Sequence, residues 1–380
     1  MARGPVQRWL SRHGHRVFHP LTGADLGTLL RLCLMGPRLT PRGASRLGFA
    51  LFTAVGRLPF DLLERLGTEL VAPPLEALPP PLLVVGHWRS GTTHLYNVLA
   101  RSPAFGIVSP LAVGLPWNVL GLGPFLRRRL EECLPVDRII DRLPVHADSP
   151  QEDELALANM QTLSFYHGAF FPTRIEREFG RGLFFAGASE AERRRWRRSV
   201  ALFMRKLHRL NGGRPLLVKN PAHSAKLPDL LRLFPDARIV HVRRNPYVVV
   251  ESTRRMLRTL LDTFALERTD GVELDRLILN TYPRMIAATE AAMAALPANR
   301  RHDLAFEDFE ADPMAELARL HVALDLPGFD DAEDHFRVYL DAVRGYEKRR
   351  HSFPQERLRL TEKALAPWID AWGYARPSGT

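Results

Sequence analysis

The sequence predicts an α/β fold in which helices cover both faces of a central parallel sheet. Three short apolar runs carry this prediction, at residues 82–85, 216–218 and 238–242. Runs of this kind are typical of strands that are buried on both faces. Helical patterns follow the first and the third run, and strands that alternate with helices form parallel sheets.

The remaining elements extend this pattern along the chain. A fourth strand is expected near 304–306. Helices are expected at 150–170, at the arginine-rich stretch 188–210, at 247–262 and near 312–324. The helix at 150–170 is expected to begin near Pro150, with acidic residues in its first turn.

Composition bounds the class of protein. The chain has 380 residues, of which 46% are hydrophobic and 25% charged, a balance typical of a globular protein with a sizeable core. Its formal net charge of +11 favours anionic partners. Neither zinc-finger spacing nor an aromatic RNA-binding segment accompanies the charge, so no nucleic-acid partner is expected.

The first 70 residues are expected to form short helices with leucine-rich faces, broken at Gly36-Pro37 and at Pro41. Their most apolar stretch, 46–63, contains Pro59 and two charged residues, so it is not expected to span a bilayer. Two interpretations stay open, a helical cap packed on the main domain and a helical pair that contacts a membrane surface.

Three domains follow from these patterns. They are an N-terminal helical extension with a proline-rich linker at 1–75, a main domain at 76–365 and a tail at 366–380. Two cysteines and the lack of a secretory signal favour a cytoplasmic location, with membrane-peripheral attachment as an alternative. The oligomeric state is not predicted.

A glycine-bounded loop follows the first strand, at 86–93. It resembles the Walker A pattern, but Thr92 stands where that pattern has lysine. The two glycines, Gly86 and Gly91, and the next helix supply backbone N–H groups that suit a phosphate. Ser90, Thr92 and Thr93 add hydroxyls, and Arg89 adds a forked cation. Without the lysine that grips β- and γ-phosphates, the loop suits a 5′-phosphate that carries no triphosphate tail.

A second candidate anion site follows the third strand. Arg244 stands at the strand's carboxyl end, and Ser252 lies eight residues later, two turns into the next helix. Such a pair can converge on one phosphate, at the edge where α/β sheets place their ligands. Taken singly, Arg244 could be a solvated charge, and Ser252 could bond back to a helix carbonyl.

These segments resemble those of sulfotransferases that use 3′-phosphoadenosine 5′-phosphosulfate (PAPS). The Arg89-Ser-Gly-Thr-Thr segment is similar to the family's 5′-phosphosulfate loop, and Arg244 with Ser252 to its 3′-phosphate segment. Lys219-Asn-Pro-Ala-His223 is similar to a segment whose lysine contacts the sulfuryl group, and Arg350-His351 to one that closes over the 3′-phosphate. The resemblance covers about residues 80–360 and implies a P-loop-like three-layer sandwich, PAPS as co-substrate and no metal.

The implied reaction is an in-line transfer of the sulfuryl group to an acceptor hydroxyl or amine. Arg89 and Lys219 are the candidates for stabilising the negative charge that builds at sulfur and on the leaving group. A general base must take the acceptor's proton. Glu152 is the first candidate for this base because it resembles a family glutamate that follows the loop; His223 and His146 are the alternatives.

Two other functions remain as alternatives. A P-loop kinase or NTPase would need a lysine at position 92 and an acidic Mg²⁺ ligand at a strand end. A non-catalytic protein on a degenerate sulfotransferase fold would bind anions or membranes without turnover. The acceptor is expected to be a small molecule, a lipid or a carbohydrate, and the apolar residues at 105–125 and 163–171 point to a lipid, polyketide or aromatic alcohol.

Overall fold

The computed structural model describes residues 19–127, 149–345 and 351–378, which divide between two compact units. Unit 1 contains the chain up to Leu78, the middle stretch Ile107–Gly213 and Leu257–Val272. Unit 2 contains Pro79–Gly106, Arg214–Met256 and Glu273–Thr380. Unit 1 thus includes the N-terminal helical segment together with part of the predicted main domain. The domain limits at residues 75 and 365 stay a prediction.

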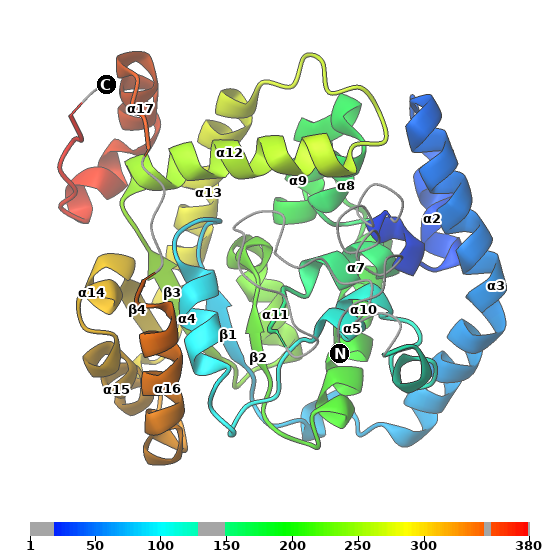
Figure 1. Ribbon diagram of the computed structural model, residues 1–380, viewed down its shortest axis with the longest axis horizontal. Helices are drawn as coiled ribbons and strands as arrows, with labels where there is room; N and C mark the ends of the chain where they lie inside the picture. Colours follow the sequence, from blue (N-terminus) through cyan, green and yellow to red (C-terminus); the bar gives the residue numbers. More distant parts are fainter. Residues whose placement is uncertain (1–18, 128–148, 346–350, 379–380) are drawn as a thin grey trace. The chain divides into compact units, whose positions relative to one another are not determined.

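Unit 2 is built on a four-stranded sheet, β1 (Leu82–Val85), β2 (Leu217–Lys219), β3 (Arg238–Arg243) and β4 (Arg301–Ala305). The strand order is β2-β1-β3-β4 and every pairing is parallel (Figure 1). Val84 pairs with Lys219 on one side and with Val240 on the other. All four residues of β1 are buried, which confirms the prediction drawn from its apolar run.

Side chains on both faces of this sheet are buried. Leu82, Val84 and Val240 contribute to a core that includes residues of α4 (Thr92–Leu99), α15 (Pro313–Ala323) and α16 (Phe329–Val343). The alternate residues Leu83 and Ile239 are buried as well. The predicted α/β sandwich is therefore confirmed.

The other helices of unit 2 follow the strands. Helix α12 (Pro246–Phe264) begins directly after β3, and its residues up to Met256 belong to unit 2. The remaining elements are η4 (Pro221–Lys226), α11 (Leu227–Leu233), α13 (Leu274–Ala294), η5 (Ala298–Arg300), α14 (Phe306–Ala311) and α17 (Gln355–Ala371). Helix α13 packs on η4 and α17.

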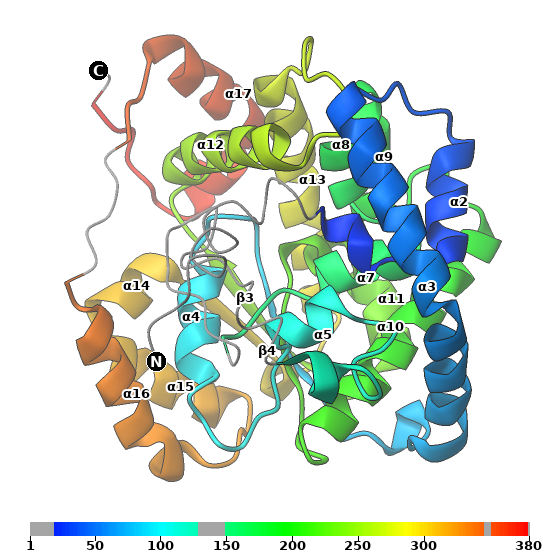
Figure 2. The ribbon, with the colours of Figure 1, turned by 45° about the vertical axis from the view of Figure 1, so that its right-hand side comes forward.

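Unit 1 is helical in the part of the chain that the structure describes. Its elements are η1 (Pro20–Gly23), α2 (Leu26–Leu34), α3 (Pro41–Val71), η2 (Leu75–Ala77), α5 (Pro110–Gly114), α7 (Glu154–Met160), α8 (Tyr166–Phe170), η3 (Pro172–Arg174), α9 (Ile175–Phe184) and α10 (Glu190–Leu210). Helices α2 and α3 lie side by side in both views (Figures 1 and 2).

Two expectations about these helices were wrong. The N-terminal segment breaks between α2 and α3 at the expected place, but α3 is one 31-residue helix that continues through Pro59, not a short one. Pro59 is exposed, so the carbonyl that loses its helical N–H partner can be solvated. The predicted helix 150–170 is two short helices, because Gln161 takes an extended conformation (φ −164°) after α7.

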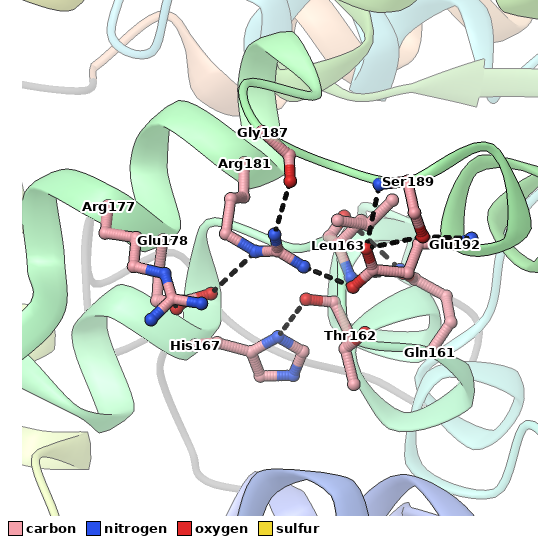
Figure 3. Close-up of polar contacts among 10 residues, drawn as sticks. All are labelled: Gln161, Thr162, Leu163, His167, Arg177, Glu178, Arg181, Gly187, Ser189 and Glu192. Atoms are coloured by element: carbon pink, nitrogen blue, oxygen red, sulfur yellow. Dashed lines mark hydrogen bonds and ion pairs between the residues drawn. The ribbon is translucent and has the colours of Figure 1, made fainter. Parts of the chain in front are cut away.

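Buried polar groups join α9 to the start of α10 (Figure 3). The Arg181 guanidinium donates to the Gly187 carbonyl over 3.2 Å and pairs with Glu192. Glu192 also accepts hydrogen bonds from the backbone and the hydroxyl of Ser189, which caps α10. Nearby, His167 is fully buried, and burial lowers its pKa to about 4, so its ring is neutral.

Candidate nucleotide site at the ends of β1 and β3

The loop after β1 has a backbone that requires glycine at two positions. Gly86 (φ 143°) and Gly91 (φ 99°) take conformations that favour glycine, and Arg89 also has a positive φ, 69°. A Cβ at Gly86 would lie 2.4 Å from the Val242 carbonyl oxygen, and one at Gly91 would lie 2.0 Å from the Phe306 ring. The glycine frame read from the sequence is therefore fixed by close packing against β3 and the start of α14.

Hydrogen bonds hold the loop in place. The Gly86 N–H donates to Ser224 Oγ over 2.9 Å, and Ser224 Oγ lies 3.1 Å from the Gly86 carbonyl, to which it donates. The Thr253 hydroxyl donates to the Trp88 carbonyl over 3.3 Å. His87, within the loop, is fully buried, and burial lowers its pKa to about 3, so its ring is neutral.

The two predicted anion sites meet through Arg89. Its Nε donates to Ser252 Oγ on α12 over 2.8 Å. Arg244 in turn donates to the Arg89 carbonyl over 3.3 Å. Both predicted clusters therefore lie at adjacent strand ends of one sheet, the edge at which such sheets bind ligands.

Phe306 supports both halves of this arrangement, although no sequence pattern indicated its role. The Arg244 guanidinium lies over its ring, 4.4 Å from the centroid, and Gly91 packs against its edge. Burial is the main cause that lowers the pKa of Arg244, with Glu307 and Glu310 acting in the opposite direction. An arginine held this way keeps its charge and has little rotational freedom.

Lys219 lies beside the start of α4. Its side chain is buried, and Nζ donates to Thr93 Oγ1 over 3.0 Å. It reaches this position because Lys219 pairs in register with Val84, one residue before the end of β1. The ammonium group is thus placed at the helix N-terminus, where the predicted 5′-phosphosulfate segment ends.

His223, the second candidate base, is buried in η4. Its Nε2 lies 3.4 Å from the side-chain nitrogen of Asn220, whose amide oxygen accepts from the Ala222 N–H. His223 therefore forms part of the turn that follows β2 and Lys219. Its catalytic role stays a prediction.

His351 is the described member of the predicted C-terminal segment. Burial lowers its pKa, and Arg255, Arg244 and Arg89 lower it further through charge repulsion. Arg255 was not predicted, although it lies on the same face of α12 as Ser252, one turn later. Arg350, as well as the third candidate base His146, lies outside the described residues.

Glu152, the first candidate base, belongs to unit 1. It is half-buried and lies just before α7, where the Gln151 N–H donates to the Val108 carbonyl. Its assignment stays a prediction, because the nucleotide site is in unit 2.

These groups fit a doubly anionic nucleotide. The loop offers backbone N–H groups at the N-terminus of α4, and Lys219 lies beside them. Among the described residues, the buried Ser90 Oγ has no hydrogen-bond partner, so it is available to a ligand oxygen. At the other end, Arg89, Arg244 and Arg255 bring positive charge close to His351. The arrangement suits one anionic group at each end.

Sequence relatives point to the same chemistry. The sequence profile of the sulfotransferase family matches residues 80–331, more than half of the chain. Among curated proteins, the omega-hydroxy-beta-dihydromenaquinone-9 sulfotransferase Stf3 of Mycobacterium bovis is 27% identical over 297 residues, covering 78% of this chain and 76% of that protein. The Stf3 of Mycobacterium tuberculosis matches to the same extent.

Solved structures share the fold. Sulfotransferase STF9 from Mycobacterium avium superposes with a TM-score of 0.67 at 20% identity, covering 90% of this chain and 89% of that one. Sulfotransferase STF1 from Mycobacterium tuberculosis gives a TM-score of 0.55 at 18% identity, covering 83% and 85% of the two chains. These structures have the same overall architecture.

Proposed function

This chain belongs to the sulfotransferase family and is an enzyme of sulfuryl transfer, and we propose that it takes the sulfuryl group from PAPS and delivers it to a hydroxyl carried on an apolar, lipid-like molecule. The family implies a sulfonate donor. The observation that carries our assignment of PAPS is the contact between Arg89 and Ser252, which joins the loop after β1 to the segment after β3.

The 5′ end of the donor is assigned to the loop. Backbone N–H groups from Gly91 to Thr93 and the hydroxyls of Ser90, Thr92 and Thr93 would bind the phosphosulfate. Support comes from the positive φ at Gly86 and Gly91, which points successive N–H groups into one concave turn. Helix α4 adds the positive end of its dipole.

The 3′-phosphate is assigned to the basic group formed by Arg244, Ser252 and His351, together with Arg89 and the newly identified Arg255. Support comes from the mutual charge repulsion that these side chains impose on His351. A phosphate bound there would replace repulsion by attraction. Arg350 keeps its predicted place in this set.

Transfer breaks the bond between sulfur and the bridging oxygen of the donor and forms a bond between sulfur and the acceptor oxygen. The products are adenosine 3′,5′-bisphosphate (PAP) and a sulfate ester. Lys219 is assigned to the charge that develops at sulfur and on the leaving oxygen, because a fixed cation at such a point lowers the barrier. The same role for Arg89 stays a prediction, since its Nε donates to Ser252 at the 3′-phosphate end. No residue needs to carry the sulfuryl group in this scheme.

The acceptor's proton goes to the general base. Glu152 is our first candidate, and His223 is the second. A carboxylate or imidazole in hydrogen-bond reach of the acceptor hydroxyl contributes about 10²–10⁴-fold to such reactions. Glu152→Gln and His223→Asn distinguish them, because only the base variant should lose kcat while it keeps PAP affinity.

A lipid-like acceptor is proposed for two reasons. The curated relative's name gives a hydroxylated dihydromenaquinone, a lipid, as that protein's substrate. In this chain, buried aromatic residues of the stretch 163–171 gather in unit 1, with Phe165, Tyr166 and Phe170 in contact with one another. Such an acceptor favours a cytoplasmic location at the membrane surface.

The test is transfer of labelled sulfate from PAPS to a panel of long-chain alcohols and hydroxylated quinones, read by mass spectrometry. We expect PAP to raise the melting temperature without Mg²⁺ and ATP to leave it unchanged. Arg89→Ala should lower kcat/KM by about 10²–10³-fold. The matched control is Arg232→Ala on α11, an exposed arginine of the same unit.

Stabilisation by ATP but not by PAP would contradict the proposal. So would turnover that survives Arg89→Ala unchanged. If PAP binds but no acceptor of the panel is sulfated, the assignment of the donor site is retained and the assignment of the acceptor is wrong.

A further inference from the structure

Helix α3 differs from an ordinary surface helix, because large apolar side chains line its exposed face while several polar and charged ones are buried. A surface helix normally buries an apolar stripe and exposes its polar face. In α3, by contrast, the buried positions include Arg46, Asp61 and Thr68, and the large apolar residues point outward. Phe52 is 74% exposed, Leu63 68% and Leu66 62%.

Helical geometry places these residues on opposite sides. At 100° per residue, positions 52, 55, 59, 63, 66 and 70 fall within one narrow arc. Positions 43, 47, 50, 54, 57, 61, 64 and 68 fall within the arc opposite. The first set is apolar and exposed throughout, and the second contains every buried residue of the helix except Arg46, which borders that arc.

The inner face is held by charged and polar contacts. Arg57 donates to the Ala24 carbonyl over 2.8 Å, and Arg46 donates to the Thr263 carbonyl over 3.0 Å. Glu64 pairs with the buried Lys206 at 2.8 Å and accepts from the backbone N–H of Gly121. These contacts fix the rotation of α3 about its axis, so the outward direction of the apolar stripe is set by the fold.

The stripe is long and carries no charge along its centre. From position 52 to position 70 it extends about 27 Å. Exposed Arg38 and Arg42 lie near the start of α3, and exposed Arg65 lies near its end, at the edge of the inner arc. The one exposed acid of this helix, Glu69, pairs with Arg205 at 2.7 Å.

We propose that the outward face of α3, with Phe52, Leu63 and Leu66 at its centre, is a docking surface for an anionic lipid bilayer. The apolar stripe would contact the acyl chains of one leaflet, and the arginines near it would contact the anionic headgroups. No described helix is long and apolar enough to cross a membrane, so α3 lies in the interface plane. This surface goes beyond the transfer reaction, since it requires no nucleotide.

Vesicle flotation with the full chain tests this surface directly. The probes are vesicles of phosphatidylcholine alone and of equal parts phosphatidylcholine and phosphatidylglycerol. We expect binding to the anionic vesicles, weaker binding to the neutral ones, and weakening with salt. The triple variant Phe52→Gln/Leu63→Gln/Leu66→Gln should lose at least about tenfold in binding.

The matched control is Val322→Gln/Val338→Gln/Leu360→Gln, three exposed apolar residues on helices of unit 2. It should bind vesicles as the wild type does. The shift in melting temperature produced by PAP reports folding in both variants. Arg89→Ala should lose transfer and keep vesicle binding, so failure of the docking surface and failure of the reaction are distinguishable.

A measurement on the unaltered chain completes the test. Amide hydrogen exchange with anionic vesicles should slow over 49–71 and stay unchanged over α15 and α16. Vesicle binding that the α3 variant retains would overturn the proposal. Failure of the wild type to bind vesicles would overturn it as well. So would a wild-type dimer that the α3 variant converts to a monomer, because a second copy would then cover this face.

Discussion

Buried charge serves two different purposes in the two units. In unit 1, cations and acids face one another at the inner side of α3, and Lys206 pairs with Glu64 at 2.8 Å. In unit 2, basic side chains around Arg89 approach one another and repel His351. Opposite charges that satisfy each other stabilise a fold. Like charges that the fold holds together indicate an anionic ligand.

The largest expected effect tests the structural half of this contrast. Lys206→Met leaves Glu64 without its cation, although the backbone groups of Leu120 and Gly121 still donate to it. Removing one member of a buried pair costs about 3–5 kcal/mol. We expect that loss in the free energy of unfolding, measured by urea denaturation, with PAP affinity unchanged in the folded protein.

The double variant Lys206→Met/Glu64→Gln is the control, because it removes both charges. It should recover part of the lost stability. A single variant as stable as the wild type would mean that this pair contributes nothing to the fold.

The second effect tests the catalytic half. Lys219→Met keeps the length and apolar part of the side chain but removes the ammonium group beside Thr93. We expect kcat to fall by about 10²–10³-fold, the range seen when one group that stabilises developing charge is removed. Rapid-quench turnover with saturating PAPS measures it.

Because Lys219 is assigned to stabilise the transition state, the affinity for PAP should change much less than kcat in this variant. Equal losses of affinity and rate would reassign Lys219 to ground-state binding.

The third effect concerns the contact that joins the two anion sites. Ser252→Ala removes the hydroxyl that accepts from Arg89, and with it one donor to the proposed 3′-phosphate. A hydrogen bond to a charged group is worth about 1.5–3 kcal/mol. We therefore expect a tenfold to hundredfold loss of PAP affinity by calorimetry (about 1.4 kcal/mol per tenfold).

Adenosine 5′-phosphosulfate, which lacks the 3′-phosphate, provides the control ligand. Its affinity should be nearly the same for the wild type and for Ser252→Ala. A parallel loss for both ligands would place Ser252 elsewhere in the site.

The smallest effect is a pH dependence. Burial and three arginines lower the pKa of His351 in the free protein. A phosphate beside it favours the protonated ring and raises that pKa in the complex, so the complex binds more protons than the free protein does. PAP should therefore bind a few-fold more tightly as pH falls from about 8 to about 6.

His351→Asn removes this titration and should flatten the profile, leaving the slope that the ligand's own phosphates contribute. An unchanged slope in the variant would separate His351 from the 3′-phosphate.

Much of the fold and of the candidate site could be predicted from local sequence. Strand β1 was predicted because four successive apolar residues have one stable environment, and the loop after it because two glycines and a following helix give a phosphate-binding turn. Arg244 and Ser252 were paired because strand ends and helix turns have fixed spacing. Phe306 and Arg255 escaped notice, since an aromatic residue after a strand and an arginine on a helix are ordinary in sequence.

The helix at 150–170 and the short N-terminal helices were wrong for a related reason. Residue patterns report periodicity, but they do not report where a buried contact interrupts a helix or where an exposed proline is tolerated. Gln161 ends α7 among buried neighbours, and Pro59 continues α3 on an exposed face.

By itself, the sequence determined the parallel sheet, the glycine loop and the chemistry of sulfuryl transfer, because each of these is encoded in a short run of residues with a required spacing. Only the tertiary structure decided that Arg89 contacts Ser252 and that α3 turns an apolar stripe outward. Both depend on residues far apart in the chain. The direction in which a helix presents its faces is fixed by the partners it packs against, and those partners lie outside its own pattern.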